Sequence, residues 1–161
     1  MAADRSYVQT NRQSLDRLRA LVERASDEDL ARPMDDGWTV ASVLGHMAFW
    51  DLRVATALER WGPDGSRPFP TIQDSFEVGD SDYDDAVDWI NDTAKPIISA
   101  LEPRAAARVA IEAAEAADRG VAAMSDELLE KNEATGLYVN TDRADHRGEH
   151  LDEIERVLPP T

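Results

Sequence analysis

The chain has 161 residues, no cysteine, and 33 acidic against 17 basic residues, which give a formal net charge of -16. We expect one domain over residues 1–161, because this length suits a single substantial core. The lack of cysteine excludes disulfides, cysteine-ligated metals and a cysteine nucleophile. The negative charge disfavours nucleic acid as a partner, and the absence of a long apolar run disfavours a membrane span. We therefore expect a soluble, cytoplasmic, acidic protein.

The first half of the chain predicts two long helices. Residues 4–24 predict the first, because apolar side chains recur at helical spacing. These apolar residues are Val8, Leu15, Leu18, Leu21 and Val22. Residues 26–30 begin with a serine suited to capping and predict a short extra turn. Thr39 is suited to cap the second long helix, which we expect to end near Trp61, before Gly62 and Pro63.

The second half of the chain also predicts helices. They follow a connection at residues 63–80, which we interpret as a long loop that either covers a site or serves as a plain crossover. Residues 83–101 predict a helix that Pro96 should kink or split. The side chains expected to face inward there are Val87, Ile90, Ala94, Ile97 and Ile98. Residues 104–124 predict an alanine-rich helix after Pro103, and residues 125–129 a short capped turn.

The last predicted helix begins between residues 139 and 142 and ends at Pro159. No segment shows the alternation of polar and apolar residues that is typical of a strand. The chain therefore predicts an all-α protein, with four long helices in a bundle and short extra helices in the connections.

The three histidines of the chain are the strongest chemical signal. His146 and His150 are four residues apart, so both rings project from one face of the last helix. His46 lies beside the apolar stripe of the second long helix. If these helices pack together, the three imidazoles could hold one divalent metal and leave a further position for water or substrate. Zinc, nickel or another first-row metal would suit such a site.

Acidic residues near the histidine pair could orient the imidazole rings. A metal-bound histidine usually donates its second ring nitrogen to a carboxylate or a carbonyl group. Asp142 lies one turn before His146, Glu153 lies three residues after His150, and Glu149 lies between the two ligands. The alternative for each acid is a solvated position on the helix surface.

Residues 146–150 also spell His-x-x-Glu-His, the inverted zinc-peptidase pattern in which the glutamate acts as general base. The pattern is weak by itself. A peptidase of this kind needs a further acidic ligand, normally on a separate downstream helix, and the sequence predicts no such helix. We do not expect peptidase activity.

Two stretches resemble the DinB-like superfamily of four-helix metalloproteins: residues 37–51, which contain Trp38 and Leu-Gly-His46-Met-Ala-Phe-Trp-Asp, and residues 146–154, which contain both later histidines. That superfamily includes transferases of low-molecular-weight thiols and mycothiol-dependent maleylpyruvate isomerases. The resemblance implies a DinB-like four-helix bundle and a metal triad of His46, His146 and His150. It also implies that the metal holds a small thiol, of the mycothiol or bacillithiol type, as thiolate for transfer to an electrophile or for an isomerisation.

Four residues near the expected metal face are candidates to line a pocket for a small-molecule electrophile or thiol. These residues are Trp50, Arg53, Trp89 and Asn91. Arg53 could pair with a substrate carboxylate. Two alternatives stay open: a non-catalytic binding or stress protein in which metal ties helices together, and a metal-dependent hydrolase. Apolar aromatic residues that the core of one chain does not require, such as Trp61, suggest a homodimer.

Overall fold

The computed structural model of the chain describes residues 3–67, 83–134 and 139–158. These ranges form helices and no strand beyond one isolated bridge between Pro33 and Thr39, so the all-α prediction is confirmed. The helices are α1 (Ser6–Arg24), α2 (Asp27–Leu30), the 3-10 turn η1 (Asp35–Gly37), α3 (Val40–Trp61), α4 (Tyr83–Ser99), α5 (Pro103–Ala122), α6 (Asp126–Ala134) and α7 (Ala144–Val157). In this described part of the chain, no helix is long and apolar enough to cross a membrane.

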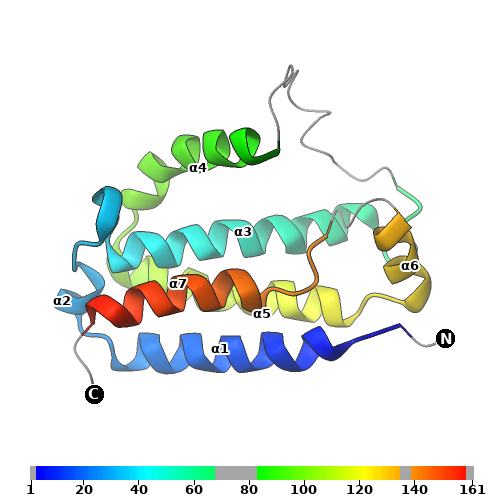
Figure 1. Cartoon of the computed structure of the whole chain (residues 1–161), viewed down its shortest axis with the longest axis horizontal. Coiled ribbons are helices and arrows are strands. Elements are labelled where there is room, and N and C mark those ends of the chain that lie inside the picture. Colours follow the sequence, from blue (N-terminus) through cyan, green and yellow to red (C-terminus); the bar gives the residue numbers. More distant parts are fainter. Residues whose placement is uncertain (1–2, 68–82, 135–138, 159–161) are drawn as a thin grey trace.

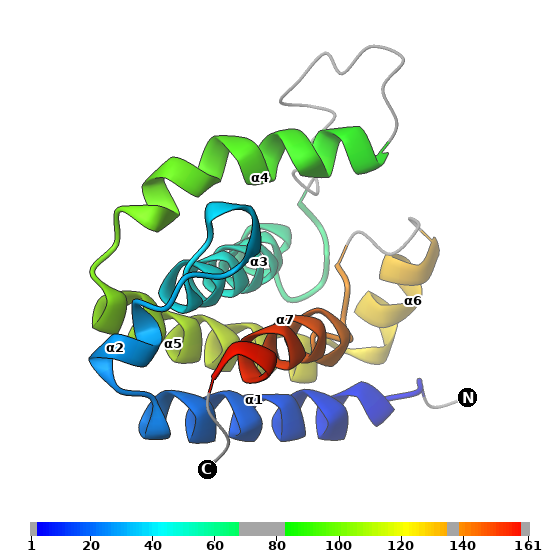
Figure 2. The same cartoon turned by 60° about the vertical axis from the view of Figure 1, so that its left-hand side comes forward.

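Helices α1, α3, α5 and α7 form the predicted four-helix bundle (Figure 1). Helix α3 packs on α5 and α7, and α1 packs on the same two helices from the other side. Helices α3 and α5 run in the same direction, so the chain must travel back between them. Helix α4 provides this return path and lies outside the bundle, where its described residues pack mainly on α3 (Figure 2).

Helix α3 begins at Val40 because Thr39 and Ser42 form a reciprocal cap. The Ser42 backbone N–H donates to Thr39 Oγ1 at 3.2 Å, and the Thr39 N–H donates to Ser42 Oγ at 2.7 Å. Gly62 ends the helix with a φ of +81°, a conformation that glycine adopts without a steric penalty. The cap fixes His46 in the second turn of α3.

The core lies where α1, α3, α5 and α7 meet. Alanines line the buried face of α5, and these short side chains let α3 approach closely. The larger side chains that fill the core include Leu18, Leu21, Leu44, Met47, Leu151 and Ile154. One prediction for α1 is wrong: Val8 is 37% exposed, and Tyr7, one residue earlier, is buried in its place.

The prediction for α4 is also wrong at one position, because Ile97 is 72% exposed. The helix packs against α3 along one narrow stripe, and Ile90 and Ile98 fill that stripe at a spacing of eight residues. Pro96 lies inside α4 without splitting it. Most of the predicted 63–80 loop, and with it the question of a covering role, lies outside the described residues.

Helix α7 begins later than the expected position between residues 139 and 142. The Asn11 side-chain oxygen accepts the backbone N–H groups of Arg143 and Ala144, at 2.8 and 3.0 Å. Asp142 Oδ1 also accepts the Ala144 N–H, at 3.1 Å. These side-chain acceptors satisfy the first free N–H groups of the helix, so the helix starts at Ala144.

Candidate metal centre

The structure brings the three predicted metal ligands together. The ring centroids of His46 and His146 lie 5.4 Å apart, those of His46 and His150 4.9 Å, and those of His146 and His150 4.7 Å. One nitrogen from each ring lies within 4.8 Å of the other two. Zinc–nitrogen bonds are about 2.0–2.1 Å long, so this separation is close to what one shared ion requires.

Helices α3 and α7 supply the three rings, His46 from α3 and the other two from α7. His146 and His150 are one turn apart on α7, and α7 runs antiparallel to α3 in Figure 1. The second turn of α3 therefore meets the first half of α7 across their contact. The site depends on this register between two helices that are about a hundred residues apart in the chain.

Burial keeps two of the rings neutral. Desolvation, with a smaller contribution from the charge of His150, lowers the pKa of His46 to about 4. Desolvation and the neighbouring charges of His150 and Arg143 lower the pKa of His146 to about 3. A neutral imidazole has a free lone pair, which is the form that binds metal. Both rings are therefore ready to act as ligands across the physiological pH range.

Hydrogen bonding selects the free nitrogen of His150. Its Nδ1 lies 2.8 Å from Glu153 Oε2, so Nδ1 donates its proton to the carboxylate and the lone pair is on Nε2. His146 Nδ1 is buried and has no hydrogen-bond partner among the described residues. An unsatisfied buried nitrogen beside two further imidazoles fits a site that takes a ligand.

The other two acidic candidates have different surroundings. Glu149 is exposed to solvent, and Asp142 accepts the backbone N–H at the start of α7. Glu153 is thus the one acid of the three for which a contact with a ligand histidine is found in the described structure. Nitrogen ligands from three histidines match the preference of zinc, nickel and other first-row metals, so this site could hold a divalent ion.

Two tryptophans flank His46. The ring centroid of Trp38 lies 5.6 Å from that of His46, and the centroid of Trp50 lies 6.4 Å from it. Helix α4 holds both tryptophans in place: Trp50 Nε1 donates to Asn91 Oδ1 at 3.0 Å, and Lys95 Nζ lies 4.8 Å from the Trp38 ring centroid. Trp50 and Asn91, both pocket candidates, therefore contact each other beside the metal site.

The remaining pocket candidates are less closely associated with the histidines. The Arg53 guanidinium lies 5.1 Å from the centroid of the Trp50 ring and 6.0 Å from that of Phe49, which places it one aromatic ring away from His46. Trp89 is 50% exposed on α4. Their roles in a pocket stay predictions.

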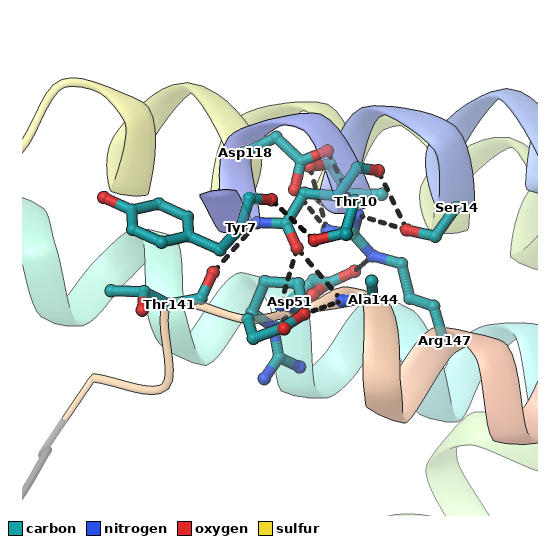
Figure 3. Close-up of polar contacts among 12 residues, drawn as sticks. Tyr7, Thr10, Ser14, Asp51, Asp118, Thr141, Ala144 and Arg147 are labelled. Atoms are coloured by element: carbon teal, nitrogen blue, oxygen red, sulfur yellow. Dashed lines mark hydrogen bonds and ion pairs between the residues drawn. The ribbon is translucent and has the colours of Figure 1, made fainter. Parts of the chain in front are cut away.

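A buried ionic network joins α7 to the other helices of the bundle and was not predicted (Figure 3). The Asp51 carboxylate on α3 accepts from Nε of Arg143 and from Nε of Arg147, each at 2.9 Å. Arg147 also makes two bonds to Asp118 on α5, at 2.8 and 3.1 Å, and its side chain is fully buried. Ser14 on α1 lies 3.4 Å from Arg147. The network links all four helices of the bundle.

Helical spacing in the sequence could have identified the charged residues of this network as buried. Arg143 and Arg147 precede Leu151 and Ile154 along the apolar stripe of α7, so both charges lie on a face that should be buried. Asp51 continues the buried stripe of α3 in the same way. A charged residue on an apolar stripe indicates a buried ion pair, because an unpaired charge there would be too costly.

Comparisons with known proteins give one match. The family model described as the DinB superfamily matches residues 10–150, which include all three histidines and most of the bundle. Searches of curated proteins and of solved structures found no match.

Proposed function

The chain belongs to the DinB superfamily, and from this premise we propose that it is a metal-dependent enzyme that acts on a low-molecular-weight thiol. In this proposal His46, His146 and His150 would hold one divalent ion, which would supply stabilisation of the thiolate form of a bound small thiol. The thiolate is then transferred to a small-molecule electrophile or used in an isomerisation. The cluster of three histidines is the observation that carries the proposal.

The residues around the cluster supply what such a site needs. Burial keeps His46 and His146 neutral, and Glu153 fixes the tautomer of His150. The described part of the chain offers three ligands, fewer than the four of a structural zinc site, which leaves a position for a further ligand. The chain contains no cysteine, so no protein thiol competes with a small thiol for that position.

A metal that only ties helices together is the main alternative. The buried network argues against it, because Asp51 on α3 already binds Arg143 and Arg147 at the α7 side of the same contact. Helices α3 and α7 are thus cross-linked without an ion. The contact between these helices therefore does not depend on a metal alone, which favours a role in chemistry.

The activity can be tested with 1-chloro-2,4-dinitrobenzene as electrophile and bacillithiol, mycothiol or glutathione as thiol. In this reaction a sulfur–carbon bond forms, the carbon–chlorine bond breaks, and chloride leaves with the electron pair. We expect turnover that requires both metal and thiol and that is absent in His146→Ala. Ester hydrolysis that needs metal but no thiol would instead support a hydrolase. Absence of any turnover, with a large fall in melting temperature on chelation, would support the structural role.

A further inference from the structure

Two arginines at the start of α7 share the buried carboxylate of Asp51 but differ in how many of their side-chain N–H groups are hydrogen-bonded. Arg143 and Arg147 both donate from Nε to the Asp51 carboxylate, and their side chains are 6% and 0% exposed. A guanidinium has five N–H donors, and the two arginines differ in how many of these donors have a partner. The remaining donors of each arginine therefore show what each one does.

Arg147 uses all three of its nitrogens. Its Nη1 bonds to Asp118 and Ser14, and its Nη2 bonds to Asp118 and to the Ala114 carbonyl. Two carboxylates neutralise its charge. Arg147 is thus a structural residue that holds α7 against α3 and α5.

Within the described structure, Arg143 uses only one side-chain nitrogen. Asp51 accepts from its Nε, and no hydrogen bond to Nη1 or Nη2 is found among the described residues. Its one carboxylate partner also bonds to Arg147, so Arg143 has only a share of a counter-ion. The side chain is nevertheless held firmly, because Asn11 accepts the backbone N–H of Arg143 and Asp51 holds Nε.

Arg143 is a near neighbour of one ligand histidine along α7. Arg143 comes one turn before His146 on the same helix, and its positive charge contributes to the lowered pKa of that ring. Its partner Asp51 directly follows Trp50, which flanks His46 from α3. Arg143 therefore lies about one helical turn from His146 on α7, and Trp50 lies one turn from His46 on α3.

We propose that Arg143 binds an anionic group, a carboxylate above all, of the small molecule whose donor atom occupies the open position of the metal. This inference rests on the proposed metal site and adds a substrate class. The substrate would be a thiol or electrophile that bears a carboxylate about 5 Å from its metal-binding atom, the length of one helical turn. The two Nη atoms form a planar pair of donors that matches a carboxylate. Such a ligand would complete the hydrogen bonds of Arg143 and the neutralisation of its charge.

The proposal can be tested with the full-length protein loaded with Co(II), whose visible absorption reports the binding of a thiolate. The probes are 3-mercaptopropionate and its neutral amide, 3-mercaptopropionamide, and the measured quantity is the ratio of their affinities. In wild type we expect a ratio that favours the carboxylate by about tenfold to a hundredfold. In Arg143→Gln the ratio should fall by at least about tenfold, while the affinity for the amide stays near that of wild type.

Comparing this ratio between wild type and variants cancels the difference in thiol pKa between the two probes. Arg17→Gln, which removes an exposed ion pair with Asp152 and Glu155, is the matched control and should keep the wild-type ratio. If Arg143→Gln loses its cobalt spectrum, Arg143→Lys replaces it, since lysine keeps the charge but not the planar pair of donors, and its ratio should fall at least threefold.

Three outcomes would overturn the proposal, and they are distinguishable. An unchanged ratio in Arg143→Gln or in its lysine replacement, with cobalt bound normally, excludes Arg143 and leaves the metal site intact. A ratio that falls in Arg53→Gln and not in Arg143→Gln assigns the anion to Arg53. Wild-type protein that develops no cobalt absorption removes the proposed metal site, and the inference with it.

Discussion

Glu153 Oε2 lies 2.8 Å from Nδ1 of His150, three residues earlier on the same helix. This contact holds the ring in the tautomer that offers Nε2 to a metal. We expect Glu153→Gln to weaken metal binding by about tenfold to a hundredfold, as is usual when the partner of a metal-binding histidine is lost. The dissociation constant for Zn(II), measured by competition with a chromophoric chelator, is the quantity to compare.

Glu149→Gln is the matched control for this substitution, because Glu149 lies on the same helix between the two histidines but is exposed. It removes the same charge at a similar distance along the chain. Equal losses of affinity in the two variants would show that general electrostatics, and not the bond to His150, accounts for the effect.

The lowered pKa values of His46 and His146 predict how the stability of the metal-free protein depends on pH. Their pKa values are about 4 and about 3 in the folded state, against 6.5 as the ordinary value. At pH values between the folded-state pKa and 6.5, each of these histidines is protonated in the unfolded chain but not in the folded chain. The free energy of unfolding therefore falls as the pH falls below 6.5. From pH 7 to pH 5 we expect a loss of about 1–2 kcal/mol for each histidine.

Urea unfolding of the chelated protein at pH 7 and pH 5 measures this loss. This interval lies above the range in which most carboxylates titrate, so the histidines dominate the change. His46→Gln removes one of the two groups and should show a clearly smaller dependence on pH. A variant with the same pH dependence as wild type would contradict the assigned cause.

The buried ionic network predicts a large effect at Asp51. This carboxylate is 1% exposed and is shared by Arg143 and Arg147. Asp51→Asn leaves two buried guanidinium groups with too little negative charge, and losing one partner of a buried ion pair costs about 3–5 kcal/mol. Asp152→Asn breaks an ion pair whose carboxylate side chain is 67% exposed and should cost less than about 1 kcal/mol.

Chemical denaturation of both variants at neutral pH gives the two free energies of unfolding. The Asp51 variant should lose several times as much as the Asp152 variant. Similar small losses would mean that water or rearranged side chains neutralise the arginines and that the network does not hold the bundle together.

Two helical glycines predict opposite effects of alanine. At Gly148 an added Cβ meets no atom within 4 Å, so Gly148→Ala should stabilise the protein by about 0.5–1 kcal/mol through the higher helix propensity of alanine. At Gly45 the added Cβ would lie 2.8 Å from Ile98 Cγ2. This methyl group is on a branched carbon with restricted rotation, so α4 must shift, and Gly45→Ala should destabilise.

Thermal unfolding of the two glycine variants tests the contact between α3 and α4. The melting temperature should rise for Gly148→Ala and fall for Gly45→Ala. A rise in both would indicate that α4 moves away at no cost, and the placement of Asn91 and Lys95 beside the metal site would then have to be revised.

Local rules predicted much of this fold and site from the sequence. The capping residue Thr39, the stop at Gly62 and the spacing of His146 and His150 depend only on neighbours within a few residues. Convergence of the third ligand, His46, needed the family resemblance in addition, because nothing in the spacing of the histidines says which helices meet.

The features that the sequence did not predict depend on which helix faces meet in the fold. Asp51 and Arg143 are 92 residues apart, and their pairing follows from the register between α3 and α7. Ile97 has the hydrophobicity of a core residue but is exposed, because α4 lies outside the bundle and buries only one stripe. Position outside a bundle is a tertiary property that helical periodicity does not encode.

The metal content of the purified protein tests the central claim most directly. Elemental analysis after loading with Zn(II) or Ni(II) and removal of excess ion should give about one ion per chain for wild type and close to none for His146→Ala. Asp152→Asn, which leaves the histidines intact, should retain the ion. Wild-type protein without bound metal, or His146→Ala with the full amount, would contradict a shared site at His46, His146 and His150.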